Sequence, residues 1–134
     1  MSRIMLATTA LALALTTTLV LAAPALASPP VPADMLLAPP PFIEATRASV
    51  PFSHELHDKA GVACVTCHHT WDGKEEIGSC SVAGCHDQPG RKGETTFYSA
   101  FHARDNDASC LSCHRSIVQE GGQAPIACKD CHIN

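Results

Sequence analysis

Four cysteine motifs, each closed by a histidine, constrain this chain more than any other feature. C-x-x-C-H is the attachment signature of c-type haem, in which two thiols bond the haem and the adjacent histidine ligates the iron. The second motif has a four-residue spacer instead of two. Because the motifs use all eight cysteines, the sequence predicts four covalently bound haems. The motifs are Cys64-Val65-Thr66-Cys67-His68, Cys80-Ser81-Val82-Ala83-Gly84-Cys85-His86, Cys110-Leu111-Ser112-Cys113-His114 and Cys128-Lys129-Asp130-Cys131-His132.

The N-terminal segment is predicted to be an export signal. Arg3 supplies the charge, an apolar run follows from Ile4 to Ala23, and Ala25-Leu26-Ala27 forms a small-x-small cleavage site. A membrane anchor is the alternative, since the run is long enough to span. We expect residues 1–27 to be a cleaved signal peptide and residues 28–134 to form one domain outside the cytoplasm, with no membrane insertion of the mature chain.

The predicted mature chain is too poor in large apolar residues to build an ordinary core. Valine, leucine, isoleucine and phenylalanine make up 19 of its 107 residues, below the roughly 20% at which disorder is suspected. Four covalently held porphyrins would supply the missing apolar bulk. The net charge of −4 becomes −5 without Arg3, and no basic stripe is present, which excludes a nucleic-acid partner.

The local sequence predicts a small, mostly irregular and helical multihaem fold, with short helices and loops wrapped around the cofactors. Prolines make the N-terminal part of the domain extended or loop-like. Short apolar segments favour a small hairpin, and serine or threonine caps favour short helices. The expected ranges are 28–48 for the proline-rich segment, 34–37 and 49–52 for the hairpin strands, and 54–59, 95–104 and 109–120 for the helices.

The number of histidines matches the number of axial positions on four haem irons. Four of the eight close the motifs as expected axial ligands: His68, His86, His114 and His132. The other four would each fill one remaining position: His54, His57, His69 and His102. Four surface histidines are the alternative. Met35 is the one methionine that remains after signal removal, so bis-histidine ligation and low reduction potentials are expected.

Zinc sites and disulfides are the two alternative roles for the cysteines. Paired cysteines with nearby histidines also form zinc sites, but zinc does not require a histidine directly after each second cysteine. Eight cysteines in an exported chain could also form four disulfides. Neither alternative explains the histidine that closes all four motifs. Six-coordinate iron leaves no open position for a substrate, so the sequence predicts an electron carrier without catalytic residues.

Taken together, four features resemble the tetrahaem cytochrome c3 family. These are Phe52-Ser53-His54-Glu55-Leu56-His57, the doubled His68-His69, the four-residue spacer of the second motif and the lone His102. The match runs from about Phe52 to His132. The resemblance implies the following axial pairs: His54 with His68 for haem 1, His69 with His86 for haem 2, His57 with His114 for haem 3, and His102 with His132 for haem 4.

The chain departs from basic members of that family. Its fourth motif has a two-residue spacer and its lysines are few, as in the acidic, type II branch. The resemblance implies a periplasmic monomer that takes electrons from hydrogenase or a basic cytochrome c3 and passes them to a transmembrane redox complex in anaerobic sulfate respiration. The alternative is a terminal reductase of metal ions, sulfur compounds or polysulfide.

Overall fold

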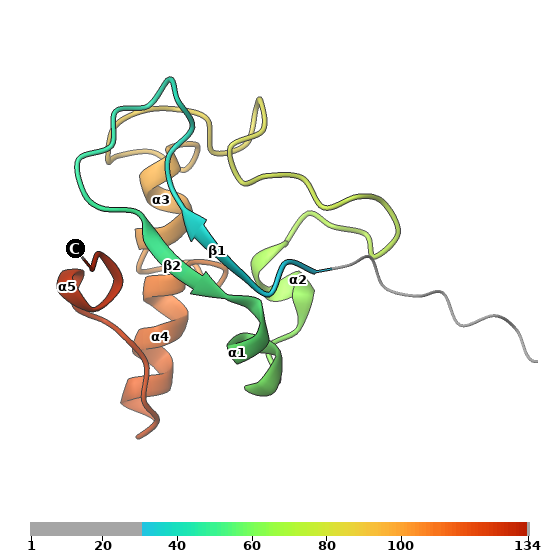
Figure 1. The fold of residues 1–134 in the computed structure, drawn as a ribbon, viewed down its shortest axis with the longest axis vertical. Coiled ribbons are helices and arrows are strands. Elements are labelled where there is room, and N and C mark those ends of the chain that lie inside the picture. The colour runs from blue at the N-terminus through green and yellow to red at the C-terminus, as the bar shows by residue number, and fades with distance from the viewer. Residues whose placement is uncertain (1–30, 134) are drawn as a thin grey trace, which may run out of the picture.

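The computed structural model describes residues 31–133, and the predicted signal peptide lies outside them. Short elements alternate with irregular segments (Figure 1). This confirms the prediction of a small, mostly irregular and helical fold with one hairpin. The elements are β1 (Asp34–Leu37), β2 (Val50–Ser53), α1 (His54–Lys59), α2 (Cys64–Cys67), α3 (Phe97–His102), α4 (Cys110–Gln119) and α5 (Cys128–Cys131).

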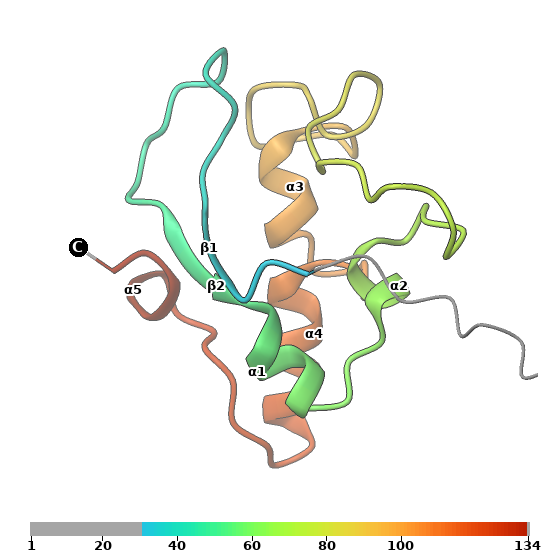
Figure 2. The ribbon, with the colours of Figure 1, turned by 45° about the vertical axis from the view of Figure 1, so that its right-hand side comes forward.

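The two strands form the predicted hairpin. β1 and β2 pair antiparallel, with Asp34 opposite Ser53 and Leu37 opposite Val50. The second strand begins one residue later than expected and continues directly into α1. Figure 2 shows the long loop between the strands, which rises away from the helices. The hairpin therefore places the start of α1, and with it His54 and His57.

Hydroxyl side chains begin three of the helices. Ser53 Oγ accepts from the Leu56 amide, Thr96 Oγ1 from the Ser99 amide and Ser109 Oγ from the Ser112 amide. Such caps satisfy amides that have no partner within the helix. The helix expected at residues 95–104 is shorter than predicted, because Thr96 is the cap and Ala103 adopts an extended backbone.

Two single-turn helices, α2 and α5, were not predicted. Each consists of the four residues from one cysteine to the next in the first and fourth motifs. Residues three apart in a helix lie on the same face. One turn therefore points both thiols of a motif to one side, which is what attachment to a single porphyrin requires.

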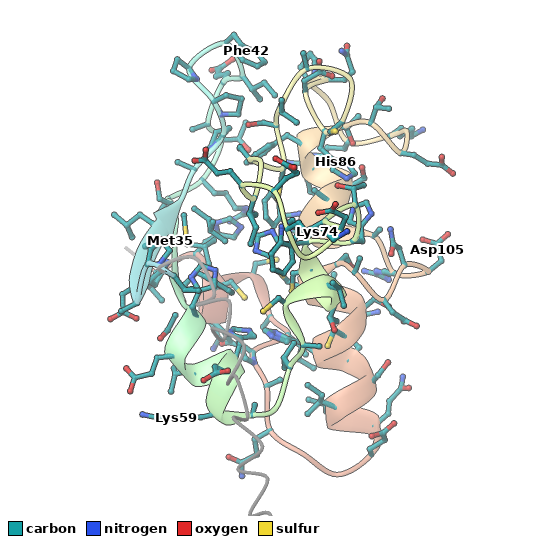
Figure 3. All side chains as sticks on the ribbon, turned by 90° about the vertical axis from the view of Figure 1, so that its right-hand side faces the viewer. Met35, Phe42, Lys59, Lys74, His86 and Asp105 are labelled. Atoms are coloured by element: carbon teal, nitrogen blue, oxygen red, sulfur yellow. The ribbon has the colours of Figure 1, made fainter. Side chains whose placement is uncertain are left out.

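The described residues contain no buried hydrophobic side chain. The buried side chains among them are Thr96, Ser109 and Ser112, and Leu36 and Leu56 are 69% and 66% exposed. Figure 3 shows side chains over the whole fold, with Phe42 at the tip of the hairpin loop. Residues 31–133 therefore have no ordinary apolar core, as expected, and their apolar side chains need a cofactor to cover them.

Buried hydroxyl groups join α3 to α4. Ser109 Oγ donates to the Ala103 carbonyl, and Ser112 Oγ donates to the Arg104 carbonyl at 3.3 Å. Figures 1 and 2 show α3 directly above α4 in both views. The described residues include no helix with the length and apolar character needed to cross a membrane.

Candidate functional site

The eight histidines lie in four pairs, and these are the pairs that the resemblance implies. Each pair joins a histidine that closes a motif to one of the other four, and the two members of a pair are 14 to 57 positions apart in the chain. The ring centroids are 6.4 Å apart for His54 and His68, 6.2 Å for His69 and His86, 6.1 Å for His57 and His114, and 6.1 Å for His102 and His132.

The spacing of the rings fits a metal ion held between two imidazoles. An imidazole–metal bond is about 2.0–2.1 Å long. Two such bonds and the half-widths of two rings together span about the observed distances. The ring planes are inclined by 16°, 18° and 6° in the first, third and fourth sites, but by 64° in the second. The second site therefore differs from the other three in ligand orientation.

Backbone carbonyls orient five of the eight imidazoles. Because a carbonyl oxygen only accepts, each of these rings donates its Nδ1–H, which leaves Nε2 unprotonated and able to bind a metal. The donors and acceptors are His54 to Pro32, His57 to Ser53, His102 to Tyr98, His114 to Pro125 and His132 to Ala48, at 2.7 to 2.9 Å.

Burial favours the neutral form of two of the expected ligands. It lowers the pKa of His68, with a further lowering from nearby His54. It also lowers the pKa of His102, although the hydrogen bond to the Tyr98 carbonyl opposes this. Iron binds neutral imidazole, so both shifts favour the form that can ligate at neutral pH.

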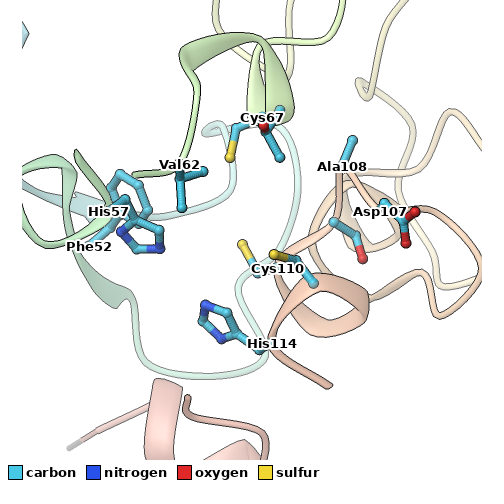
Figure 4. Close-up of a pocket in the computed structure, with 11 residues that line it drawn as sticks. Phe52, His57, Val62, Cys67, Asp107, Ala108, Cys110 and His114 are labelled. Atoms are coloured by element: carbon cyan, nitrogen blue, oxygen red, sulfur yellow. The ribbon is translucent and has the colours of Figure 1, made fainter. Parts of the chain in front are cut away.

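The third site shows the arrangement of ligands and thiols most clearly. In Figure 4, His57 of α1 and His114 of α4 face each other across a gap. The sulfur of Cys110, from the third motif, points into this gap, and so does that of Cys67, from the first motif. An adjoining cavity of about 1020 Å³ is bordered by the same two histidines and by apolar residues of the hairpin, among them Leu36 and Leu37. A large flat apolar group fits this place.

All eight cysteines lie within residues 31–133, and none of them is joined in a disulfide. Burial raises the pKa of the Cys110 thiol to about 11, and neighbouring cysteines add to the effect. Burial likewise raises the pKa of Cys67, Cys80 and Cys131. With a raised pKa, each of these thiols stays protonated and neutral at neutral pH.

The alternative of a zinc site finds no matching geometry. Among residues 31–133, no three or more histidine, cysteine, aspartate or glutamate side chains are placed to share one metal ion. Structural zinc needs four such ligands around one centre. The cysteines and histidines instead lie in pairs, as two thioethers and two axial ligands per haem require.

Sequence reasoning missed how the aromatic residues contact the ligands. The Phe52 ring lies 4.8 Å from the His54 ring and 4.7 Å from the His57 ring, so it touches histidines of two different sites. Tyr98 stacks on His102 at 4.1 Å, and the Arg91 guanidinium lies 5.5 Å from the Tyr98 ring. The i, i+4 spacing of Tyr98 and His102 in α3 was a usable signal for this contact.

Comparison with known proteins agrees with this geometry. The family model described as "Class III cytochrome C family" matches residues 31–132. The chain belongs to the class III cytochrome c family. As a member of it, the protein is a multihaem electron-transfer protein that carries four c-type haems, and the predicted resemblance to tetrahaem cytochrome c3 is confirmed.

The relatives support this membership over most of the domain. Cytochrome c3 of Maridesulfovibrio salexigens is 45% identical over 104 residues, which cover 75% of this chain and 93% of the relative. Cytochrome c3 of Desulfovibrio desulfuricans is 42% identical over 102 residues, 75% of this chain and 94% of the relative. The crystal structure of the di-tetraheme cytochrome c3 from Desulfovibrio gigas aligns with a TM-score of 0.68 at 32% identity, over 78% of this chain and 98% of that one.

Proposed function

We propose that the four haems are held by the residues that the sequence singled out. The eight cysteines of the four motifs form the thioethers, two to each haem. The four histidine pairs ligate the irons from both sides. The support is the spacing of 6.1 to 6.4 Å between paired rings, together with the carbonyl acceptors that fix five of the tautomers. When bound, each haem supplies an iron that cycles between the ferric and ferrous states.

The pairing of all eight histidines carries the proposed function. An iron with two axial imidazoles has no open position for oxygen or another substrate, so the protein accepts and delivers electrons without transforming a substrate. Four low-spin, six-coordinate spectra and no reaction of the reduced protein with carbon monoxide are expected. Carbon monoxide binding to a native haem would show an open site and would favour a terminal reductase of metal ions or polysulfide.

The protein is proposed to work in the periplasm, as a low-potential carrier of the acidic, type II branch. The predicted signal peptide supports the location. The two-residue spacer of the fourth motif and the negative net charge support the branch. Lys59, one of the few lysines, is also paired with Glu55. A chain with so little free positive charge suits a basic donor, such as a basic cytochrome c3, better than direct docking to hydrogenase.

Stopped-flow reduction tests this assignment. Oxidised protein is mixed with hydrogenase and hydrogen, with and without a basic cytochrome c3, over a range of salt concentrations. We expect the basic cytochrome to accelerate reduction at least about tenfold at low salt and to lose most of this effect at high salt. Equally fast reduction by hydrogenase alone, insensitive to salt, would contradict the proposed place between a basic donor and a transmembrane redox complex.

A monomer is proposed as the working form. The four haems would occupy every cysteine, which leaves no thiol for an intermolecular disulfide. The expected mass in solution is that of one chain with four haems, and it should not change with dilution or with a reducing agent. A dimer at micromolar concentration would contradict this proposal.

A further inference from the structure

The four haem sites differ in the number of hydrogen bonds that their axial histidines make. In the third and fourth sites both imidazoles donate Nδ1–H to a backbone carbonyl. In the first site His54 donates to the Pro32 carbonyl, and His68 makes no such bond with residues 31–133. In the second site neither His69 nor His86 does so within the described chain.

The second site holds the one buried side-chain polar atom among the described residues that has no partner. His86 Nδ1 is enclosed by the protein and makes no hydrogen bond. His69 is exposed, and its Nδ1 makes no hydrogen bond with residues 31–133. A buried ring nitrogen without an acceptor is unusual, because most buried polar atoms are paired.

This difference acts directly on the iron. When Nδ1–H donates to a carbonyl, the ring gains imidazolate character and becomes a more basic ligand. A more basic ligand stabilises ferric iron over ferrous iron and lowers the reduction potential. A haem whose ligands lack these acceptors is therefore easier to reduce. The gradient runs from two carbonyl acceptors at sites 3 and 4, through one at site 1, to none at site 2.

We propose that the second site has the most positive reduction potential of the four, so the first electron received by the protein comes to rest on the iron between His69 and His86. The step is the one-electron reduction of ferric to ferrous iron, with the electron supplied by the reduced donor protein. This inference rests on the proposed bis-histidine carrier and adds an order of filling to it.

One neighbouring charge works against this order. Asp87 follows His86 directly, and a carboxylate near an iron favours the ferric state. Both oxygens of Asp87 already accept hydrogen bonds, one from the Gly84 amide and one from the Gln88 side chain. These bonds hold the carboxylate at the surface, whereas the missing acceptor acts on the ligating ring itself.

The crossed ring planes of the second site allow its haem to be distinguished from the other three by spectroscopy. Axial imidazoles with crossed planes give a more anisotropic low-spin ferric signal in electron paramagnetic resonance than parallel imidazoles do. The planes are inclined by 64° at site 2 and by at most 18° at the others. In a stepwise reductive titration of the four-haem protein, we expect the most anisotropic signal to disappear first. If any other signal disappears first, the proposal is wrong.

A shortened chain tests the mechanism independently of that spectroscopic distinction. The mature protein is made to begin either at Val31, which retains the Pro32 carbonyl, or at Ala33, which removes it but keeps the bond from the His54 amide to the Ala33 carbonyl. Measured near pH 9.5, where the terminal amine is neutral, the Ala33 form should shift haem 1 to an earlier place in the titration and leave haems 3 and 4 unchanged. An unchanged haem 1 would contradict the hydrogen-bond mechanism.

These outcomes are separate from those that test the proposed function. If the titration order is as expected but stopped-flow shows no transfer from a basic cytochrome, the partner assignment fails and the order stands. If transfer occurs but another site fills first, the carrier stands and the inference about His69 and His86 fails.

Discussion

Two regions of this molecule position the same kind of ligand in different ways. The haem-2 loop, residues 70–95, carries Cys80, Cys85 and His86 with no helix or strand. The helical unit, α3 and α4 at residues 97–119, carries His102 and the third motif on regular structure. The helical unit contains buried, hydrogen-bonded serines, whereas the loop turns at glycines with positive φ, including Gly73, Gly84 and Gly90.

The haems take the place of ordinary structural contacts to different extents in the two regions. In the helical unit, capping and buried hydroxyl groups hold the backbone before any cofactor is considered. The haem-2 loop has only turns and surface hydrogen bonds, so under the proposed attachment two thioethers and one axial bond would supply most of its order. The helical unit therefore binds haem on a backbone that is already held in place, whereas haem is the main structural support of the haem-2 loop.

The largest test of this comparison removes one axial histidine from each region. His114→Ala should lower the free energy of unfolding by more than about 4 kcal/mol, because it releases α4 from His57 on α1. His86→Ala should lower it by less than half as much, because the order that is lost is confined to the haem-2 loop, which contains no helix or strand. Denaturant unfolding followed by circular dichroism measures both. Equal losses would show that the two regions depend on their ligands alike.

Removal of a serine hydroxyl group should have the second-largest effect, and it should destabilise the protein more in the helical unit than in the haem-2 loop. Ser109→Ala loses both the cap of α4 and the bond to the Ala103 carbonyl, and should destabilise the protein by about 1–3 kcal/mol. The matched control is Ser79→Ala, since Ser79 lies exposed in the loop and bonds Ser81. The control should change stability by less than about 0.5 kcal/mol. A control as damaging as Ser109→Ala would mean that the loop has a hydrogen-bonded framework of its own.

Glycine substitutions probe how readily each region relaxes. Gly121 directly follows the C-cap of α4 with φ of 89°, and Gly90 turns the haem-2 loop with φ of 97°. A Cβ in this conformation costs about 1–2 kcal/mol where the backbone cannot move. Gly121→Ala should lose most of that amount and Gly90→Ala less, because the loop can adjust. Melting temperatures of the two variants, measured on protein with four haems, test this ranking. A larger decrease for Gly90→Ala than for Gly121→Ala would contradict it.

The smallest expected effect is a pH response confined to the loop. Amides of Lys74 and Glu75 donate to the Asp72 carboxylate and hold its pKa below the ordinary 3.8. Because the pKa is lower in the folded state, these hydrogen bonds stabilise the fold at pH values above the unfolded pKa. This stabilisation is lost as the pH falls through the folded pKa. NMR should show the two amides moving together below pH 3.8. In Asp72→Asn the chemical shifts of the same two amides should not change with pH. If amides of the helical unit shifted with the same pH dependence in the unsubstituted protein, the response would not be confined to the loop.

The sequence was most informative where chemistry fixes spacing. The cysteine motifs predicted the cofactors, and the histidine count with the family resemblance predicted which rings lie together. The hairpin and two of the helices followed from apolar segments and from Ser53 and Ser109 as caps. These features depend on neighbours in the chain, so a single sequence contains them.

The features that the sequence did not reveal depend on distant backbone. No side-chain pattern marks the carbonyls of Pro32, Ala48 and Pro125 as acceptors for histidines. The crossed planes of His69 and His86 likewise arise from the path of the loop. The single turns α2 and α5 could have been read from the C-x-x-C spacing, since that spacing places both thiols on one helical face.

The hydrogen bond from His132 to the Ala48 carbonyl joins residues 84 positions apart, at 2.7 Å. A chain is made from its N-terminus, so the hairpin loop emerges long before the histidine that anchors it. Local pieces such as α4 can form early, whereas this contact waits for the last motif. A polypeptide interrupted before Cys128 would carry three haems and an unfastened N-terminal loop, an open end that proteases can attack. The fourth motif therefore also fastens the hairpin loop, and a chain that lacks this motif cannot make the contact.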